Sequence, residues 1–207
     1  MKKPIVAAAI AAVLLSPALA EERSYDLDGF EGVSASAGTR VEIKIAPDFT
    51  VRAVGDSEAI DRLKIEVDGM TLEVGRKPGV NFGRNQKVTV YVTLPNLKAL
   101  SVSSGADAGA AGVAGGPFAL DGSSGGHAEV SGACDSLAAN VSSGGFLNAE
   151  RLECRTASAD ASSGGHLKLF VSESISADAS SGGNIEVYGS PPNVDVDRSS
   201  GGSVTVK

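Results

Sequence analysis

Apolar and polar positions alternate through the second half of the chain, around a short polar phrase that recurs six times. The phrase is Ser-Ser-Gly-Ala at 103–106 and Ser-Ser-Gly-Gly in the five later copies, and successive copies start 20, 19, 20, 18 and 19 residues apart. A period of this length is typical of a repeat protein, in which each unit buries its apolar face by stacking on its neighbours.

Three positions of every repeat are apolar, and the positions between them are mostly polar. Three residues before each phrase stand Leu100, Leu120, Ala139, Ala159, Ala177 and Val196. Five residues after its start stand Ala108, Ala128, Leu147, Leu167, Ile185 and Val204. Seven residues after its start stand Ala110, Val130, Ala149, Leu169, Val187 and Val206. This alternation predicts two short strands per repeat, with the phrase at the bend between them.

The pattern predicts an all-β fold, a right-handed parallel β-helix in which equivalent residues of successive coils stack about 4.8 Å apart. Glycine in the phrase provides positive φ or close backbone approach at the corner, and stacked Ser hydroxyls are expected to bond one another. The predicted corner residues are Ser123, Gly125, Ser142, Gly144, Ser162, Gly164, Ser180, Gly182, Ser199 and Gly201. A left-handed hexapeptide β-helix is disfavoured because six does not divide the 20-residue spacing, and the GGxGxD phrase of calcium-binding rolls is missing.

The first half of the chain predicts a signal peptide and a separate β-rich portion. Residues 1–20 combine two lysines, an apolar run of 11 residues and an Ala-x-Ala site, as secretory signals do. Residues 21–96 form the expected N-terminal β portion, and residues 97–207 the repeat coils of the same domain. Expected strands cover 23–27, 41–45, 49–54, 64–67, 70–74 and 87–94. A short helix is expected at 56–63 with Asp56 as N-cap, and a hairpin turn at Asp68-Gly69.

Two cysteines occupy one position of adjacent repeats. Cys134 and Cys154 lie 20 residues apart, and each stands eight residues before the next phrase. Stacking of one coil on the next would bring their Cα atoms within the range of roughly 4.4–6.8 Å that a disulfide needs. With a signal peptide directing the chain to an oxidising compartment, we expect a disulfide; two stacked free thiols are the alternative.

Charge and composition narrow the classes of partner. Without the predicted signal, 16 basic residues face 25 acidic ones, a net charge of −9. A chain this acidic, without a basic cluster, is a poor candidate for binding nucleic acid or anionic lipid. The absence of a second long apolar stretch predicts no membrane span.

Several stretches resemble those of a known family. They are Phe30-Glu31-Gly32-Val33, the strand at 41–45, Val54-Gly55-Asp56, the stretch at 63–72, the stretch at 88–100 and the Ser/Gly repeats. In this order they are similar to the head GIN domain family of putative auto-transporter adhesins, from about Glu22 to Lys207. The resemblance implies export from bacteria, a right-handed β-helix with an N-terminal β portion, and no catalytic residues to transfer.

The most suggestive surface feature is a column of Asp and Asn residues. Two residues before each phrase stand Ser101, Asp121, Asn140, Asp160, Asp178 and Asp197. Stacked carboxylates repel one another unless they are solvated, protonated or bridged by a cation. The column could therefore bind cations or a cationic polymer, and Ca²⁺ is the natural choice among metal ions because it prefers oxygen ligands. The alternative, which we favour, is that each side chain caps its local turn by accepting a backbone N–H.

Other candidate sites are weaker. His127 and His166 share a column but lie two coils apart, about 10 Å by the same stacking, which is too far for one metal ion. The loop at 79–87, with Asn81, Arg84, Asn85 and Lys87, is locally basic and could contact an anion, although we favour an ordinary solvated loop. Serine recurs as a structural column without a GxSxG motif, so no Ser nucleophile is expected. The sequence therefore predicts no catalytic residue, no cofactor and no metal site.

These observations favour an exported, non-enzymatic, adhesin-like protein of the bacterial cell envelope. It would display a rigid ladder to a repetitive partner such as a polysaccharide or another envelope protein, in the periplasm, at the envelope or outside the cell. The alternatives are a polysaccharide-active enzyme built on a β-helix and a scaffold that self-associates through its end coil.

Overall fold

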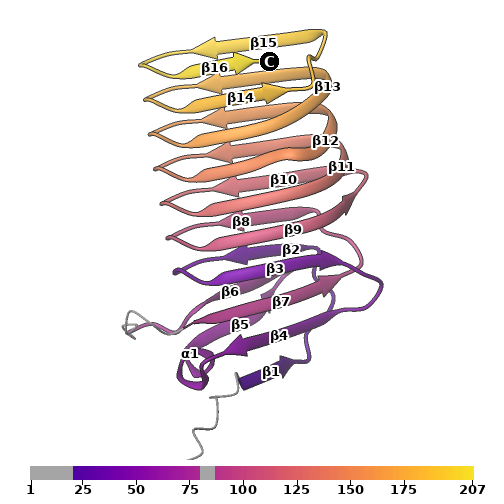
Figure 1. Ribbon diagram of the computed structural model, residues 1–207, viewed down its shortest axis with the longest axis vertical. Helices are drawn as coiled ribbons and strands as arrows, with labels where there is room; N and C mark the ends of the chain where they lie inside the picture. The colour runs from indigo at the N-terminus through magenta and orange to yellow at the C-terminus, as the bar shows by residue number, and fades with distance from the viewer. Residues whose placement is uncertain (1–20, 80–86) are drawn as a thin grey trace, which may run out of the picture.

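The protein forms a tall β-solenoid (Figure 1). The computed structural model describes residues 21–79 and 87–207, so the predicted signal peptide and most of the basic loop lie outside the described residues. In Figure 1 the coils from β2 and β3 upward have their nearer strands running to the right and those behind running to the left while the chain rises toward its C-terminal end. This sense of winding is right-handed, and the predicted right-handed parallel β-helix is confirmed.

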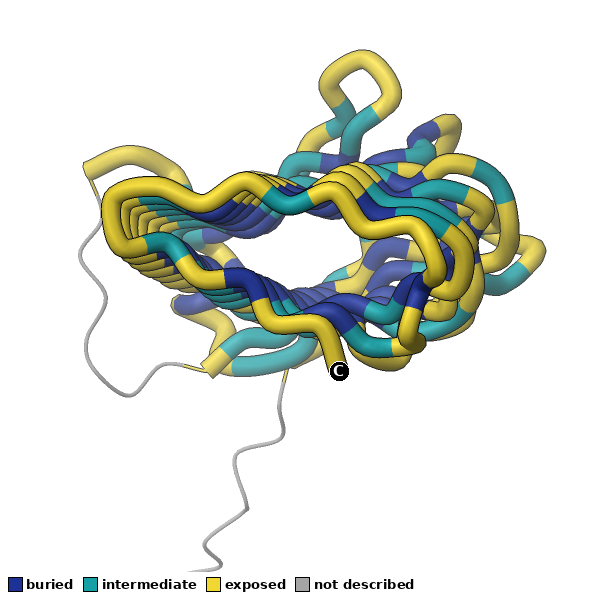
Figure 2. The backbone as a smooth tube through the Cα atoms, turned by 90° about the horizontal axis from the view of Figure 1, so that it is seen from above, coloured by how far each residue is buried: buried dark blue, intermediate teal, exposed yellow. Residues whose placement is uncertain are grey.

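Two sheets face each other across a flattened core, as the view along the axis shows (Figure 2). The front sheet contains, from the N-terminal end of the stack, β1 (Glu21–Tyr25), β4 (Thr50–Gly55), β7 (Val88–Leu94), β3 (Arg40–Ile45), β9 (Asp107–Ala114), the first parts of β11 (His127–Val141), β12 (Phe146–Ala161) and β13 (His166–Ala179), β14 (Asn184–Tyr188) and β16 (Ser203–Val206). The back sheet contains, in the same direction, β5 (Leu63–Asp68), β6 (Thr71–Arg76), β2 (Gly32–Ala35), β8 (Ala99–Val102), β10 (Pro117–Gly122), the second parts of β11, β12 and β13, and β15 (Asn193–Arg198).

The three apolar columns of the sequence are stacked in register. Leu120 pairs with Leu100 in the coil below and with Ala139 in the coil above, and Leu147 likewise pairs with Ala128 and Leu167. All members of the columns are buried except Val196 and Val206, which belong to the last coil. The predicted inward positions are therefore confirmed. Val196 and Val206 are less buried because no described coil packs above them.

The columns also compensate for each other in size. Where the back sheet contributes Leu100 or Leu120, the front sheet of that coil contributes Ala108 or Ala128. The later coils reverse this order, with Ala before the phrase and Leu or Ile after it in 139–185. Gly122 follows the same logic, because a Cβ atom there would come within 2.7 Å of Leu147 Cδ2. The cross-section of each coil is thus filled to a similar volume, as a closely packed core requires.

The corner phrase adopts a turn in which two consecutive residues have positive φ. In the copy at 162–165, Ser163 has φ of 49° and Gly164 of 73°, and the Gly165 N–H donates to the Ser162 carbonyl at 2.8 Å. Positive φ at both central positions is the signature of a type I′ turn. From the sequence, this conformation is expected only of glycine, yet the second Ser adopts it in all six phrases.

The corners are joined by backbone rather than by hydroxyl groups. The Gly144 N–H donates to the Ser163 carbonyl of the next coil at 3.2 Å, and Gly125 donates to Ser143 in the same way. Within the described residues, no hydrogen bond joins two Ser side chains of the phrases, so the expected hydroxyl ladder was wrong. The backbone already provides the ladder's donors and acceptors at this edge.

The N-terminal strands are interleaved with the repeats and close one end of the stack. The coil formed by β2 and β3 lies between β6 and β7 below it and β8 and β9 above it, with parallel pairing on both sides. Below β6 and β7, the strands β4, β1 and β5 pair in antiparallel fashion. The helix α1 (Ser57–Asp61) lies at this end and buries Ala59 and Ile60 (Figure 1).

The structure confirms the predicted hairpin in this region and corrects three other local predictions: the helix covers Ser57–Asp61 and not 56–63, the first strand covers Glu21–Tyr25 and not 23–27, and Gly32–Ala35 is a further strand. The hairpin joins β5 and β6 with Asp68 paired to Thr71, as the Asp68-Gly69 signal predicts. The helix begins directly after Asp56, which has extended dihedral angles, but the Asp56 side chain makes no capping bond. Its Oδ2 instead accepts the Lys87 N–H at 2.8 Å, so this carboxylate ties β7 to the start of the helix.

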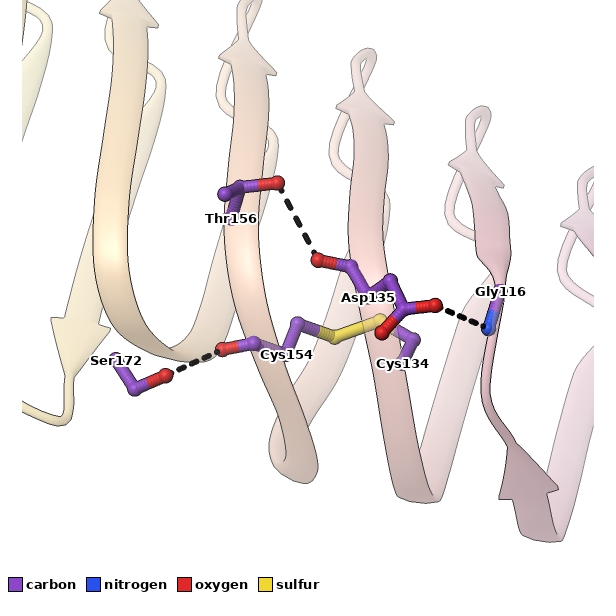
Figure 3. The surroundings of a disulfide bond; sticks show 6 residues. All are labelled: Gly116, Cys134, Asp135, Cys154, Thr156 and Ser172. Carbon is purple, nitrogen blue, oxygen red and sulfur yellow. Dashed lines mark hydrogen bonds between the residues drawn. A yellow bond between two sulfur atoms is a disulfide. The ribbon is translucent and has the colours of Figure 1, made fainter.

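The predicted disulfide between Cys134 and Cys154 is present, with Cα atoms 4.5 Å apart (Figure 3). It joins β11 to β12 at the bend opposite the corner phrases, where the register of β12 against β13 shifts. Side chains reinforce this region: Asp135 Oδ2 accepts the Gly116 N–H at 3.1 Å, and Ser172 Oγ donates to the Cys154 carbonyl at 3.4 Å. The bend is thus cross-linked where the backbone ladder is least regular.

Candidate functional site: a groove on the back sheet

The column of Asp and Asn residues lies on the outer surface of the back sheet, beside the corner phrases. Asp121 pairs with Asn140, Asn140 with Asp160, Asp160 with Asp178, and Asp178 with Asp197 in successive coils. The lower part of this column forms a groove with the first Ser of each phrase, lined by Ser101, Asp121, Asn140, Asp160, Ser103, Ser123, Ser142 and Ser162. The fold thus brings the predicted ladder and the predicted corner serines to one surface.

The side chains of the column contact one another rather than the turn. Asn140 Nδ2 donates to Asp121 Oδ1 at 3.0 Å. Within residues 21–79 and 87–207, no Asp or Asn of the column accepts a hydrogen bond from the backbone, which the turn-capping interpretation requires. The Asn140 amide instead satisfies one carboxylate and separates Asp121 from Asp160, which lowers the repulsion along the column.

The column provides repeated acceptors with a one-coil spacing. Among the described residues, none of its four carboxylates lies within 4.0 Å of a basic group, and no three His, Cys, Asp or Glu side chains gather as metal ligands do. Carboxylate and Ser oxygens at intervals of about 4.8 Å can accept hydrogen bonds from hydroxyl or ammonium groups of an extended ligand. The arrangement is therefore suited to contact with a polymer.

The rest of the back sheet is flat because its outward side chains are small. The neighbouring outward column contains Ala119, Ala138, Ser158, Ser176 and Asp195. Shallow hollows follow this column on both sides of Ala157. A long ligand lying along the groove would meet no bulky side chain from this column.

The front sheet carries larger side chains, including both histidines. His127, Phe146 and His166 pair in successive coils, and their rings stack edge to face with centroids 5.0 and 5.2 Å apart. His166 Nε2 lies 3.2 Å from Glu186 Oε1. The two histidines thus share a column, as predicted, with an aromatic ring between them.

Glu186 is the centre of a charged cluster on this sheet and makes stability depend on pH. The hydrogen bond from Lys207, those from Tyr188 and His166, and the charge of Lys168 lower the pKa of Glu186 from 4.5 to about 2. A depressed pKa in the folded state stabilises the protein above pH 4.5, and this stability is lost as the pH falls toward 2.

We therefore expect Tm to fall between pH 4.5 and 2 more steeply in the wild type than in Glu186→Gln. The difference should be roughly 3 °C, measured by circular dichroism. Glu153→Gln, which alters an exposed carboxylate outside the cluster, is the matched control and should follow the wild-type curve. Parallel curves for wild type and Glu186→Gln would show that Glu186 does not stabilise the fold.

The basic loop predicted at 79–87 lies mostly outside the described residues. Lys87 remains described, and its backbone N–H is bound by Asp56 as above. No helix in the described parts of the chain is long and apolar enough to cross a bilayer.

Known proteins resemble this chain in sequence and in fold. Residues 29–191 match the family described as "putative auto-transporter adhesin, head GIN domain". Among solved structures, a putative adhesin from Bacteroides fragilis NCTC 9343 is similar with a TM-score of 0.74 and 18% sequence identity, over 92% of this chain and 98% of that one.

Two further structures come from Parabacteroides distasonis ATCC 8503. A putative adhesin has a TM-score of 0.52 and 15% identity, over 91% of this chain and 97% of that one. A putative lipid binding protein has a TM-score of 0.51 and 17% identity, over 92% and 97%. At such identities the likeness concerns the fold alone. No curated protein matches the sequence.

Proposed function

The chain belongs to the putative auto-transporter adhesin, head GIN domain family, and we propose on this basis that it is an exported, non-enzymatic protein that binds a repetitive partner at the bacterial cell envelope. The partner is a polysaccharide or another envelope protein, and the binding surface is the groove of the back sheet. The predicted signal peptide supports export.

The observation that carries the proposal is the register of the groove. Asp121, Asn140 and Asp160 occupy the same position in three successive coils, so their oxygen and amide groups form a column beside a parallel column of Ser residues. A partner that repeats its own groups at a regular interval could contact several coils at once. Such multivalent contact raises the overall affinity without requiring a strong contact at any one coil.

The groove itself favours binding over catalysis. Its lining residues are Ser, Val, Gly, Asp and Asn, so it contains no Lys, Arg or His to pair with a reacting carboxylate. Enzymes that use an acid and a base need neighbouring groups with different proton affinities, which different environments create. Three carboxylates of this column, Asp160, Asp178 and Asp197, are exposed, and Asp121 is half-buried and bound by Asn140, so no acid and base stand side by side in the groove.

The test is a panel of dextran, chitosan, alginate and soluble peptidoglycan fragments, with binding and release of products measured on the same samples. We expect at least one polymer to bind, and Asp160→Lys to weaken that binding about tenfold, because it places a bulky opposite charge in the groove.

Glu153→Lys is the matched control, since it makes the same change of charge on the same strand, outside the groove. Equal effects of the two variants would contradict a role of the groove, and cleavage of a polymer would favour the enzyme.

A second candidate function, self-association, is favoured by the C-terminal end of the stack. Among described strands, β15 pairs only with β13 and β16 only with β14, so the outer edges of both are unpaired. Val194 and Val206 at this end remain 45% and 41% exposed. Open edges and uncovered apolar groups are templates for association. Light scattering of the protein alone over a concentration series distinguishes this function. Self-association predicts a molar mass that rises with protein concentration, whereas a monomer that binds polymer keeps a constant mass when no polymer is present.

A further inference from the structure

A hollow lies on the opposite face, in the front sheet near the closed end of the stack. It has a volume of about 500 Å³ and is lined by residues of β4, β7, β3 and β9. Pockets for small ligands have volumes of about 300–1,000 Å³. The hollow is therefore large enough for one or two sugar rings, whereas the groove of the back sheet is long and shallow.

The hollow lies where β9 carries small residues, and Ala111 and Gly112 form its wall on this strand. The outward column that contains Gly109 continues on either side with Tyr91, Glu42, Glu129 and Asn148. A Cβ atom at Gly109 would lie 2.8 Å from Glu42 Oε2, so the Glu42 side chain lies over the bare backbone.

One wall of the hollow is an aromatic ring held by a cation. Tyr91 is 37% exposed, and the Arg52 guanidinium lies 4.8 Å from the centroid of its ring. Arg52 is itself held by Glu22, with Nη1 and Oε1 3.4 Å apart. Because Arg52 lies over one face of the ring, a ligand would approach Tyr91 from its edge or from the side of Glu42, its neighbour on β3.

Two charged side chains lining the hollow have no partner in the protein. Within the described residues, neither Glu42 nor Lys44 makes an ion pair or a side-chain hydrogen bond. Their neighbours on the sheet are paired, as Arg40 is with Asp107 at 3.6 Å. Lys44 can therefore donate to an anionic group, and Glu42 can accept from hydroxyl groups.

A third polar group is fixed in place at the edge of the hollow. Thr93 Oγ1 donates to the Asp48 carbonyl at 2.8 Å and lies 2.8 Å from Thr50 Oγ1. Since the Thr93 hydroxyl donates its hydrogen bond to the backbone carbonyl of Asp48, Thr50 is the donor of the bond between the two hydroxyls, and the orientation of both is set before any ligand arrives. A lone pair of Thr50 remains available as an acceptor.

We propose that this hollow binds a sugar residue that carries a carboxylate, such as a uronic acid. An aromatic ring provides a surface for the apolar face of a sugar, as ligand pockets combine apolar walls with a few placed polar groups. Lys44 pairs with the carboxylate, while Glu42 and Thr50 accept from ring hydroxyls. The proposal is independent of the groove, because the two surfaces lie on opposite sheets.

The test compares D-glucuronate with D-glucose, which differ only in the group at C6, by NMR titration of ¹⁵N-labelled protein. We expect saturable shifts confined to β3, β7 and β9, and binding of glucuronate several-fold tighter than glucose. Lys44→Met should reduce glucuronate binding to the level of glucose. Tyr91→Ala should weaken both sugars roughly tenfold.

Ala111→Leu provides a second test that keeps every proposed binding group. Because Ala111 is exposed on a strand, leucine should leave the fold intact while it fills the hollow and abolishes both titrations. Lys168→Met is the matched control, a lysine of the same sheet outside the hollow, and should bind as the wild type does. Unchanged binding in Ala111→Leu, no saturable shifts, or shifts that map to the back sheet would overturn the proposal.

Discussion

Replacing Gly183 with alanine is expected to destabilise the protein by roughly 3 kcal/mol, near the upper end of what overpacking costs. A Cβ atom at this position would lie 2.2 Å from the Ala161 carbonyl oxygen of the coil below. That neighbour is backbone and is bonded to the Ser180 N–H, so it cannot move aside without opening the ladder. The two coils would have to separate at this corner.

Gly182→Ala is the matched control, one residue earlier in the same phrase. Gly182 has φ of 75°, and nothing lies within 4 Å of a Cβ atom built there. The alanine therefore meets only the backbone strain of the left-handed region, which costs about 1 kcal/mol. Urea unfolding of both variants measures the difference. Equal losses in the free energy of unfolding would contradict the prediction, because they would show that the lack of room for a Cβ atom at Gly183 adds nothing to the cost of the substitution.

Removing the disulfide should have the other large effect. We expect Cys134→Ser combined with Cys154→Ser to lower the free energy of unfolding by about 3 kcal/mol, as for a cross-link that closes a loop of about 20 residues. The loss falls at the bend where the pairing of β12 with β13 is interrupted. Hydrogen exchange should therefore increase first at 131–136 and 151–156.

Reduction of the wild type provides the comparison for this variant. Both cysteines are buried, so reductant should act only after the region opens, and the native protein should keep its disulfide for long periods. Fully reduced wild type should then unfold at the same urea concentration as the double variant. A double variant as stable as the oxidised protein would contradict this account.

Much of the solenoid could be predicted because its coils are built from local repeats. The position of Leu120 or Leu147 relative to the corner phrase decided which way it faces, and one column position placed Cys134 over Cys154. The corner of the β2–β3 coil was missed because it has no such phrase. Ser36 to Thr39 form the same turn, with φ of 55° at Ala37 and 64° at Gly38.

The spatial order of the N-terminal coils could not be predicted from the sequence. β6 pairs with β2 and not with β8, although nothing in the residues at 71–76 distinguishes the two partners. This choice depends on contacts between segments distant in sequence, which no local pattern records. The antiparallel cover of β4 and β5 follows from the same arrangement.

The groove and the hollow also differ in how far the sequence predicts them. The groove residues are visible in the sequence as a column because they recur with the repeat. The hollow combines Arg52 and Tyr91 with Lys44, from three strands that become neighbours only in the fold. The signal that could have pointed to it is Ala111, a small residue at a position that is Ser, Glu, Phe, Tyr or Lys in the later repeats.

The interleaving of β2 and β3 has a consequence for the order of folding. In chain order β2 and β3 come before β6 and β7, which lie below them, and before β8 and β9, which lie above them. We therefore expect the segment from about 30 to 102 to fold as one cooperative unit, because pairing β2 with β6 and β3 with β7 requires contacts between segments distant in sequence. From there each new coil has a finished template, and growth proceeds one layer at a time toward the C-terminus.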